Sequence, residues 1–265
     1  MPYIRPQRER GRQFRIAMRT IFSSTILVFF VVGSIFAGES RPLVAVMVSD
    51  DHYDADTLLP PLVEKLAKTN GWDIVLLHGE GAANFPNIDA LEKADTLVIY
   101  VRRLALPKDQ LAALKKYVGS GRGLVGLRTA CHGFTLRNKP APDGCENWPE
   151  FDAEVIGGNY NDHGKDAHGS DIQNVESKLD STILKNVKPD RWHSIGSLYW
   201  TAPIKEDTTL YQVGSSPEGK DVPVTWTRMH GKTRVAFTAL GHQKDFEVEA
   251  FQTLLRNMIA WSLEK

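Results

Sequence analysis

Residues 43–48 read Leu43-Val44-Ala45-Val46-Met47-Val48, an apolar run bounded by Arg41-Pro42 and Ser49-Asp50-Asp51. A strand that is apolar on both faces is typical of a parallel sheet covered on both sides. The next apolar residues recur at three-to-four spacing from Leu58 to Ala67 and stop at Asn70-Gly71, which predicts a helix. We therefore expect the domain to begin with a β–α–β unit.

The same alternation continues along the chain. Further strands are predicted at residues 72–77, 96–101 and 123–127, and a helix begins at Pro107 and ends before Gly119. Short strands with hairpin-like spacing follow near residues 172–175, 194–200, 209–214, 224–228 and 233–238, and a final helix covers residues 248–262. The pattern predicts an α/β fold: a doubly wound, mainly parallel sheet with an antiparallel extension at one edge.

Composition narrows the possible classes of protein. The 265 residues are 42% hydrophobic and 24% charged, an ordinary globular mixture. Two cysteines, Cys131 and Cys145, are too few for a disulfide framework or a four-cysteine zinc site.

Residues 1–37 carry a separate signal. They contain six arginines and one glutamate, and the arginines precede an apolar stretch between Ile21 and Phe36. This pattern predicts a secretory signal peptide cleaved after Ala37, with an uncleaved membrane anchor and a start at Met18 as alternatives. The working domain, residues 41–265, is then expected outside the cytoplasm. Its excess of acidic over basic residues argues against a nucleic-acid partner and favours a small molecule.

Polar residues follow the predicted strands where ligands bind in open α/β sheets. Asp50, Asp51 and His52 follow the first strand, and Arg102 and Arg103 follow the third. The later candidates are Cys131 and His132 after the fourth strand, His163 in the polar loop over residues 135–168, and His242 after the last strand. We expect segments near residues 50, 132, 163 and 242 to surround one hollow.

The turn Ala130-Cys131-His132-Gly133 resembles the nucleophile elbow of the PfpI-type peptidase and deglycase family. At a helix start Cys131 would gain a lowered pKa and backbone donors for an oxyanion, and Asp50 or Asp51 would assist it. The alternatives are a packing role for Cys131 or a disulfide with Cys145.

A longer resemblance runs through three blocks of sequence. The first block is 121–127 leading to His132-Gly133-Phe134. The second is Trp148, Phe151-Asp152 and 155–160 before Asp162-His163. The third is 223–228, 231–232, 234–238, Leu240-Gly241-His242, Phe246 and Trp261. In this order they resemble the ThuA-like (trehalose-utilisation) family. The resemblance implies a flavodoxin-like fold of the class I glutamine amidotransferase-like superfamily and a role in carbohydrate metabolism. The chain departs from the family pattern at two positions. The family commonly has His where this chain has Arg128, and Thr or Ser where this chain has Cys131.

The residues themselves are consistent with sugar chemistry. Imidazoles suit proton transfer near neutral pH, so His132 and His242 are predicted to act as general acid and base, positioned by Asp50 or Asp51. The predicted sugar-binding residues are His52, Trp148, Asn159, Tyr160 and His163, which offer hydrogen-bonding groups and aromatic surface.

Other readings of the same residues stay open. His52, His132, His163 and His242 with Asp50 or Asp162 could hold a divalent metal such as zinc. No dinucleotide-binding fingerprint is present in the sequence. The alternatives to a His-based sugar enzyme are a hydrolase or deglycase that depends on Cys131, and a sugar-binding or interaction module without catalysis.

Overall fold

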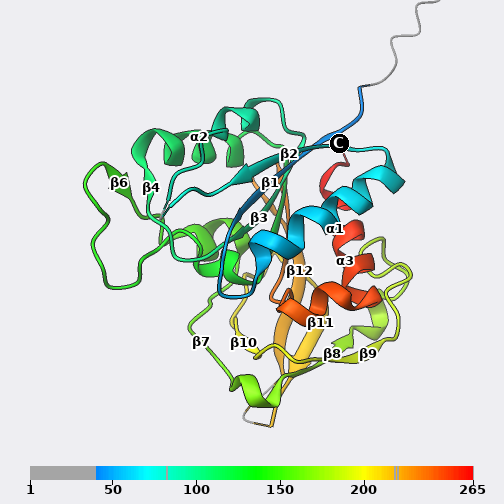
Figure 1. The fold of residues 1–265 in the computed structure, drawn as a ribbon. Helices are drawn as coiled ribbons and strands as arrows, with labels where there is room; N and C mark the ends of the chain where they lie inside the picture. Colours follow the sequence, from blue (N-terminus) through cyan, green and yellow to red (C-terminus); the bar gives the residue numbers. More distant parts are fainter. Residues whose placement is uncertain (1–39, 82, 218, 220, 265) are drawn as a thin grey trace, which may run out of the picture. The chain divides into compact units, whose positions relative to one another are not determined.

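The computed structural model describes residues 40–264 except 82, 218 and 220. Its main feature is a sheet of nine strands with helices on both sides (Figure 1). The strands are β1 (Leu43–Ser49), β2 (Asp73–His78), β3 (Thr96–Val101), β5 (Gly123–Leu127), β8 (Ser170–Asn174), β9 (Arg191–Ser194), β11 (Thr209–Ser215), β12 (Val222–His230) and β13 (Thr233–Thr238). The helices are α1 (Ala55–Asn70), α2 (Lys108–Val118) and α3 (Glu249–Ser262). The predicted signal segment, residues 1–37, lies outside the described residues.

The sheet has a parallel half and an antiparallel half. Its order is β2-β1-β3-β5-β13-β12-β11-β8-β9. The first five strands are parallel, and every later strand is antiparallel to its neighbour. The parallel half therefore has the strand order of a flavodoxin-like sheet, in which the topological switch point lies between β1 and β3. This architecture confirms the predicted fold class.

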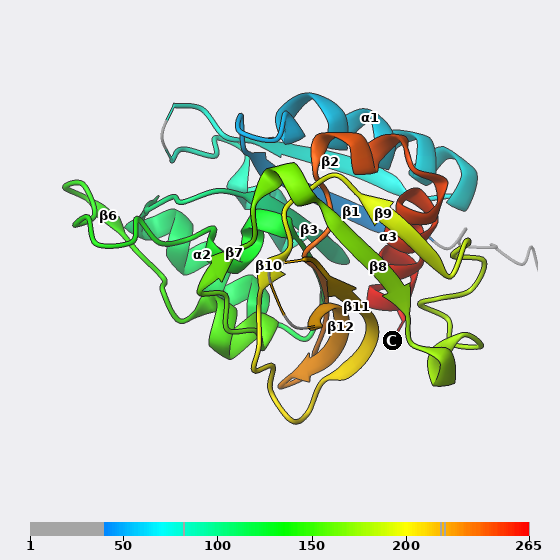
Figure 2. The same ribbon diagram turned by 90° about the horizontal axis from the view of Figure 1, so that it is seen from below.

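The parallel strands are apolar because both of their faces are covered. Helices α1 and α3 lie on one side of the sheet and α2 on the other, as Figures 1 and 2 show. All six residues of β3 are buried. A Cβ atom at Gly123 would clash with the carbonyl oxygen of Ser262, so a glycine is needed where β5 packs against α3.

Two predictions about the antiparallel region need correction. Strand β13 is antiparallel to β12, but it is also parallel to β5 and so completes the parallel half. The strand expected over residues 194–200 is interrupted: β9 ends at Ser194, and β10 (Tyr199–Trp200) pairs with β7 (Asp162–His163) in a separate ladder. The interruption arises because the Ser194 hydroxyl donates to Asp245 and accepts from the Gly196 N–H, which turns the chain.

Shorter elements occur in the segments that connect the strands of the large sheet. The turns are η1 (Ile88–Glu92), η2 (Arg128–His132), η3 (Asp152–Ile156), η4 (Asp166–His168), η5 (Glu176–Lys178) and η6 (Gln243–Glu247), and β4 (Leu106–Pro107) pairs with β6 (Cys145–Glu146). The predicted short helix near residues 150–156 is the π-helical turn η3, which Gly157 ends with a φ of 81°. In the part of the chain that the structure describes, no helix has the length and apolar character needed to cross a membrane.

Candidate functional site

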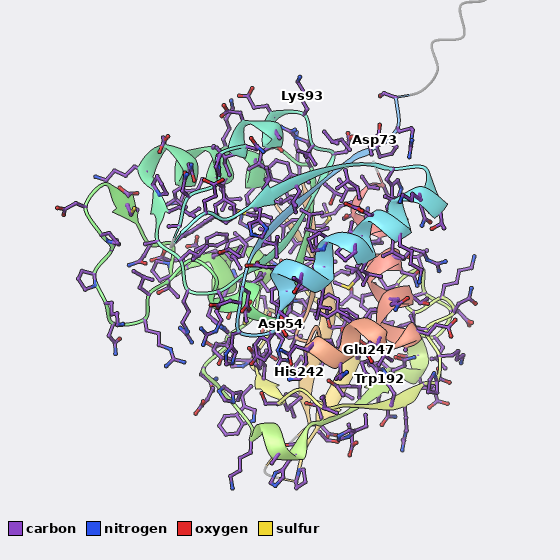
Figure 3. The ribbon with its side chains drawn as sticks, in the orientation of Figure 1. Asp54, Asp73, Lys93, Trp192, His242 and Glu247 are labelled. Carbon is purple, nitrogen blue, oxygen red and sulfur yellow. The ribbon has the colours of Figure 1, made fainter. Side chains whose placement is uncertain are left out.

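The carboxyl ends of the parallel strands gather most of the predicted site residues. Asp50 follows β1, Arg103 follows β3, the turn η2 follows β5, and His242 follows β13 by four residues. Figure 3 labels His242 and Asp54 close together at this edge. There the side-chain amide of Gln243 donates to Asp54 at 2.6 Å.

Asp50 is a buried carboxyl group that holds the loops after β1 and β5 together. One oxygen accepts from the Thr129 hydroxyl at 2.9 Å, and the other accepts from the backbone N–H of His52 at 2.8 Å. Burial raises the pKa of Asp50, while these hydrogen bonds oppose the shift. The sequence predicts that Asp50 positions His132 or His242, whereas the hydrogen bonds of Asp50 in the structure orient Thr129 and the loop containing His52.

Arg128 forms a layer with two tyrosines at the centre of the edge. Its guanidinium lies 4.3 Å from the centroid of the Tyr53 ring and 4.4 Å from that of Tyr199, and the side chain is 1% exposed. It donates to the carbonyl of Ala239 at 3.0 Å. We call these three residues the Tyr–Arg–Tyr stack. The ring of His242 contacts Tyr53, and the ring of His132 lies 5.8 Å from Tyr199, so the two histidines contact different members of the stack.

A polar pocket of about 560 Å³ lies between η2, η3 and the adjoining loops. Its lining residues are Arg103, Cys131, His132, Thr135, Arg137, Asn138, Pro149, Asp152, Ala153, Gly158, Asn159, Tyr160, Asn161 and Asp162. Its volume falls within the range of small-molecule sites, roughly 300–1,000 Å³. Four predicted site residues, Cys131, His132, Asn159 and Tyr160, line this pocket.

Asp152 is the most perturbed acid of the pocket. Its side chain lies in η3 and is 8% exposed, because the neighbouring Phe151 and Val155 are packed in the core. One carboxyl oxygen accepts from the backbone N–H of Tyr160 at 2.7 Å, and the other has no hydrogen-bond partner among the described residues. Burial raises the pKa of Asp152 to about 7. A carboxyl group with this pKa exchanges protons near neutral pH.

His132 has the opposite shift. Burial lowers its pKa to about 2, and the positive charges of Arg103 and Arg102 contribute to the lowering. Its ring is tilted by 32° against that of Tyr160, with 4.5 Å between the centroids. His132 is therefore a neutral hydrogen-bonding group. Because a general acid or base works best with a pKa near the working pH, this low pKa does not suit the acid–base role predicted for His132.

Cys131 has a protonated thiol. Its Sγ lies 3.1 Å from the carbonyl oxygen of Arg128 and 3.4 Å from Nδ1 of His132. Burial raises the pKa of Cys131, and the charge of Asp152 adds to the shift. This environment is the reverse of the lowered pKa that the elbow resemblance implied. Cys131 and Cys145 are both free, so the structure does not contain the disulfide weighed above.

Other predicted site residues lie outside the lining of the pocket. Trp148 is 8% exposed and packs edge-on against Phe151, so little of its ring can contact a ligand. His52 is exposed beside Tyr53, with 4.5 Å between ring centroids. His163 is exposed and lies 6.1 Å from Tyr199. The expected segments therefore meet around one aromatic cluster, but they do not share one hollow.

The proposed metal ligands do not converge. Within the described residues, no group of three or more His, Cys, Asp or Glu side chains is placed to hold a metal ion.

Several important residues were not assigned a role from the sequence. In the sequence Asp152 is indicated only by the family motif that contains it, and Tyr53, Tyr199 and Arg137 carry no pattern that indicates a site role. Arg103 was noted at a strand end without a role. The position of Arg103, two residues after the end of β3, is a usable signal, whereas the burial of Asp152 depends on tertiary packing.

The fold and the site together define the class of protein. Five parallel strands in flavodoxin-like order, with a polar pocket at their carboxyl ends, form an α/β domain of the flavodoxin-like class. The chain belongs to the ThuA family, because the family model described as "Trehalose utilisation" matches residues 44–262. That description indicates a sugar-related role.

Solved structures agree with this assignment at the level of the fold. A protein described as ThuA-like from Bacteroides uniformis is 15% identical, with a TM-score of 0.62, and the match covers 84% of this chain and 92% of that one. Another from Parabacteroides merdae is 16% identical, with a TM-score of 0.62 and coverage of 84% and 90%. Agd3, described as a carbohydrate deacetylase, is 12% identical with a TM-score of 0.50, covering 82% of this chain and 32% of its own. No curated protein matches the sequence.

Proposed function

We propose that this protein binds a small sugar or sugar derivative in the pocket between η2 and η3, and that Asp152 transfers a proton to or from it. The main observation in support is that the Asp152 carboxyl group is buried and has one oxygen without a hydrogen-bond partner among the described residues. As a carboxylate it accepts a proton from the ligand, and as an acid it returns one.

The other residues of the pocket are assigned binding roles. Tyr160 offers a half-buried aromatic face, which suits the apolar face of a sugar ring. The amides of Asn159 and Asn161 offer donors and acceptors for hydroxyl groups. His132, neutral at physiological pH, donates or accepts a hydrogen bond without changing its charge. The family description, trehalose utilisation, supports a sugar as the ligand.

The test separates binding from reaction. Wild type and Asp152→Asn are incubated in D₂O with trehalose, maltose and their keto-sugar derivatives, and ¹H NMR follows deuterium incorporation and product formation. We expect the wild type to react with at least one sugar and Asp152→Asn to lose at least a hundredfold in rate, in line with the ~10²–10⁴-fold contribution of general acid–base catalysis. Calorimetric binding of the same sugar is expected to persist in the variant.

The matched control is Asp143→Asn. Asp143 is an exposed aspartate of the same polar loop and does not line the pocket. We expect this variant to retain the wild-type rate. Equal rates in wild type and Asp152→Asn would refute the role of Asp152. Sugar binding without any reaction would favour the sugar-binding module, which the neutral state of His132 also suits.

We also propose that residues 1–37 direct export of the domain. The support is the arginine-rich start followed by an apolar stretch. Sequencing the amino terminus of protein from the producing cell is expected to show cleavage after Ala37. An intact amino terminus on cytoplasmic protein would refute the proposal.

A further inference from the structure

Two arginines line the pocket, and neither has a partner for its charge in the part of the chain that the structure describes. Arg103 follows β3, and Arg137 lies in the polar loop after η2. Among residues 40–264 as described, neither guanidinium takes part in a hydrogen bond or an ion pair. Burial lowers the pKa of Arg103, and the positive charge of Arg137 lowers it further, so the two groups are close enough to repel each other.

The acidic groups at the pocket do not neutralise this pair. Asp152 is a buried acid whose pKa of about 7 leaves much of it uncharged near neutrality. Asp162 is an exposed carboxylate, and among the described residues it forms no ion pair with Arg103 or Arg137. Cys131 and His132 are uncharged for the reasons given above. Residues 38–265 carry 26 basic and 31 acidic residues, so this positive pocket lies in an acidic domain.

We infer that the ligand of this pocket carries an oxyanion, a carboxylate or a phosphate, that binds between Arg103 and Arg137. This inference rests on the proposed sugar-binding function and specifies the class of sugar. Guanidinium groups present paired N–H donors that match the geometry of carboxylate and phosphate oxygens. The amides of Asn138, Asn159 and Asn161 surround the same space and suit the hydroxyl groups of the remaining sugar.

The test compares sugars that differ in charge. Calorimetry with the full chain measures binding of lactitol against lactobionate, and of glucose against glucuronate and glucose 6-phosphate. At least one acidic sugar is expected to bind about tenfold or more tightly than its neutral counterpart, the equivalent of one charged hydrogen-bonded contact. The carboxylate and phosphate arms identify which oxyanion the site prefers.

Variants locate the effect. Arg103→Gln and Arg137→Gln are each expected to weaken binding of the acidic sugar about tenfold or more while leaving the far-ultraviolet circular dichroism unchanged. Lys139→Gln removes a charge from the same loop at an exposed position outside the pocket, and its affinity is expected to match the wild type within a factor of two or so.

The outcomes distinguish the two proposals. Equal affinity for neutral and acidic sugars, or equal losses in Arg137→Gln and Lys139→Gln, would overturn the oxyanion inference and leave the sugar pocket standing. Failure of every neutral and acidic sugar to bind would overturn both.

Discussion

The raised pKa of Asp152 predicts that its carboxyl group destabilises the folded protein at neutral and alkaline pH. The pKa is about 7 in the fold, against a usual value of 3.8. The folded protein therefore holds this proton more tightly than the unfolded chain does, and stability is lost as the pH rises from about 4 to about 7. At 1.36 kcal/mol for each pKa unit, the loss reaches about 4 kcal/mol above pH 7.

The substitution Asp152→Asn removes this ionisation and keeps almost the same side-chain size and shape. We expect its free energy of unfolding, relative to wild type, to rise with pH and to level off above pH 8, with a total rise of about 4 kcal/mol. Urea unfolding followed by tryptophan fluorescence between pH 4 and pH 9 measures the difference, in which titrations common to both proteins cancel. A difference that stays flat across this range would refute the assignment of the raised pKa to Asp152. The exposed control Asp143→Asn is expected to give a flat difference.

Three further predictions concern the surroundings of the pocket. Cys131 in the folded protein is expected to react with iodoacetamide at pH 7 at least tenfold more slowly than in urea, because its raised pKa disfavours the thiolate; equal rates would contradict this. Thr129→Val, which removes the hydrogen bond to Asp50, is expected to destabilise the fold by about 1–3 kcal/mol, while Thr129→Ser keeps the hydroxyl and most of the stability; equal unfolding midpoints for the two would refute the bond's importance. Gly158→Ala is expected to cost about 1–3 kcal/mol in chemical unfolding, because its Cβ would lie 2.6 Å from the Asp152 carboxylate; a wild-type midpoint would show that the site can relax.

The sequence was sufficient to predict four of the five strands of the parallel half, namely β1, β2, β3 and β5. Apolar runs identify strands that are buried on both faces, and the run at residues 43–48 became β1 (Leu43–Ser49). The place of β13 beside β5 could not be predicted in this way, because periodicity reports which faces are buried and carries no information on the neighbouring strand.

The candidate site was predictable only in part. Residues at strand ends identified the correct edge of the sheet, including His132 and Arg103. The sequence did not indicate that Arg128 would be buried between two tyrosines, since arginine is most often exposed. Nor did it indicate that Asp152 would be buried, because that depends on the packing of residues distant along the chain.

A crystal structure of the protein with lactobionate tests the central claim most directly. We predict that the sugar lies in the pocket between η2 and η3, with its carboxylate within hydrogen-bond distance of Arg103 and Arg137 and a sugar hydroxyl beside Asp152. A sugar bound next to His242 and Tyr53, on the other side of the Tyr–Arg–Tyr stack, with the pocket holding only solvent, would contradict the account.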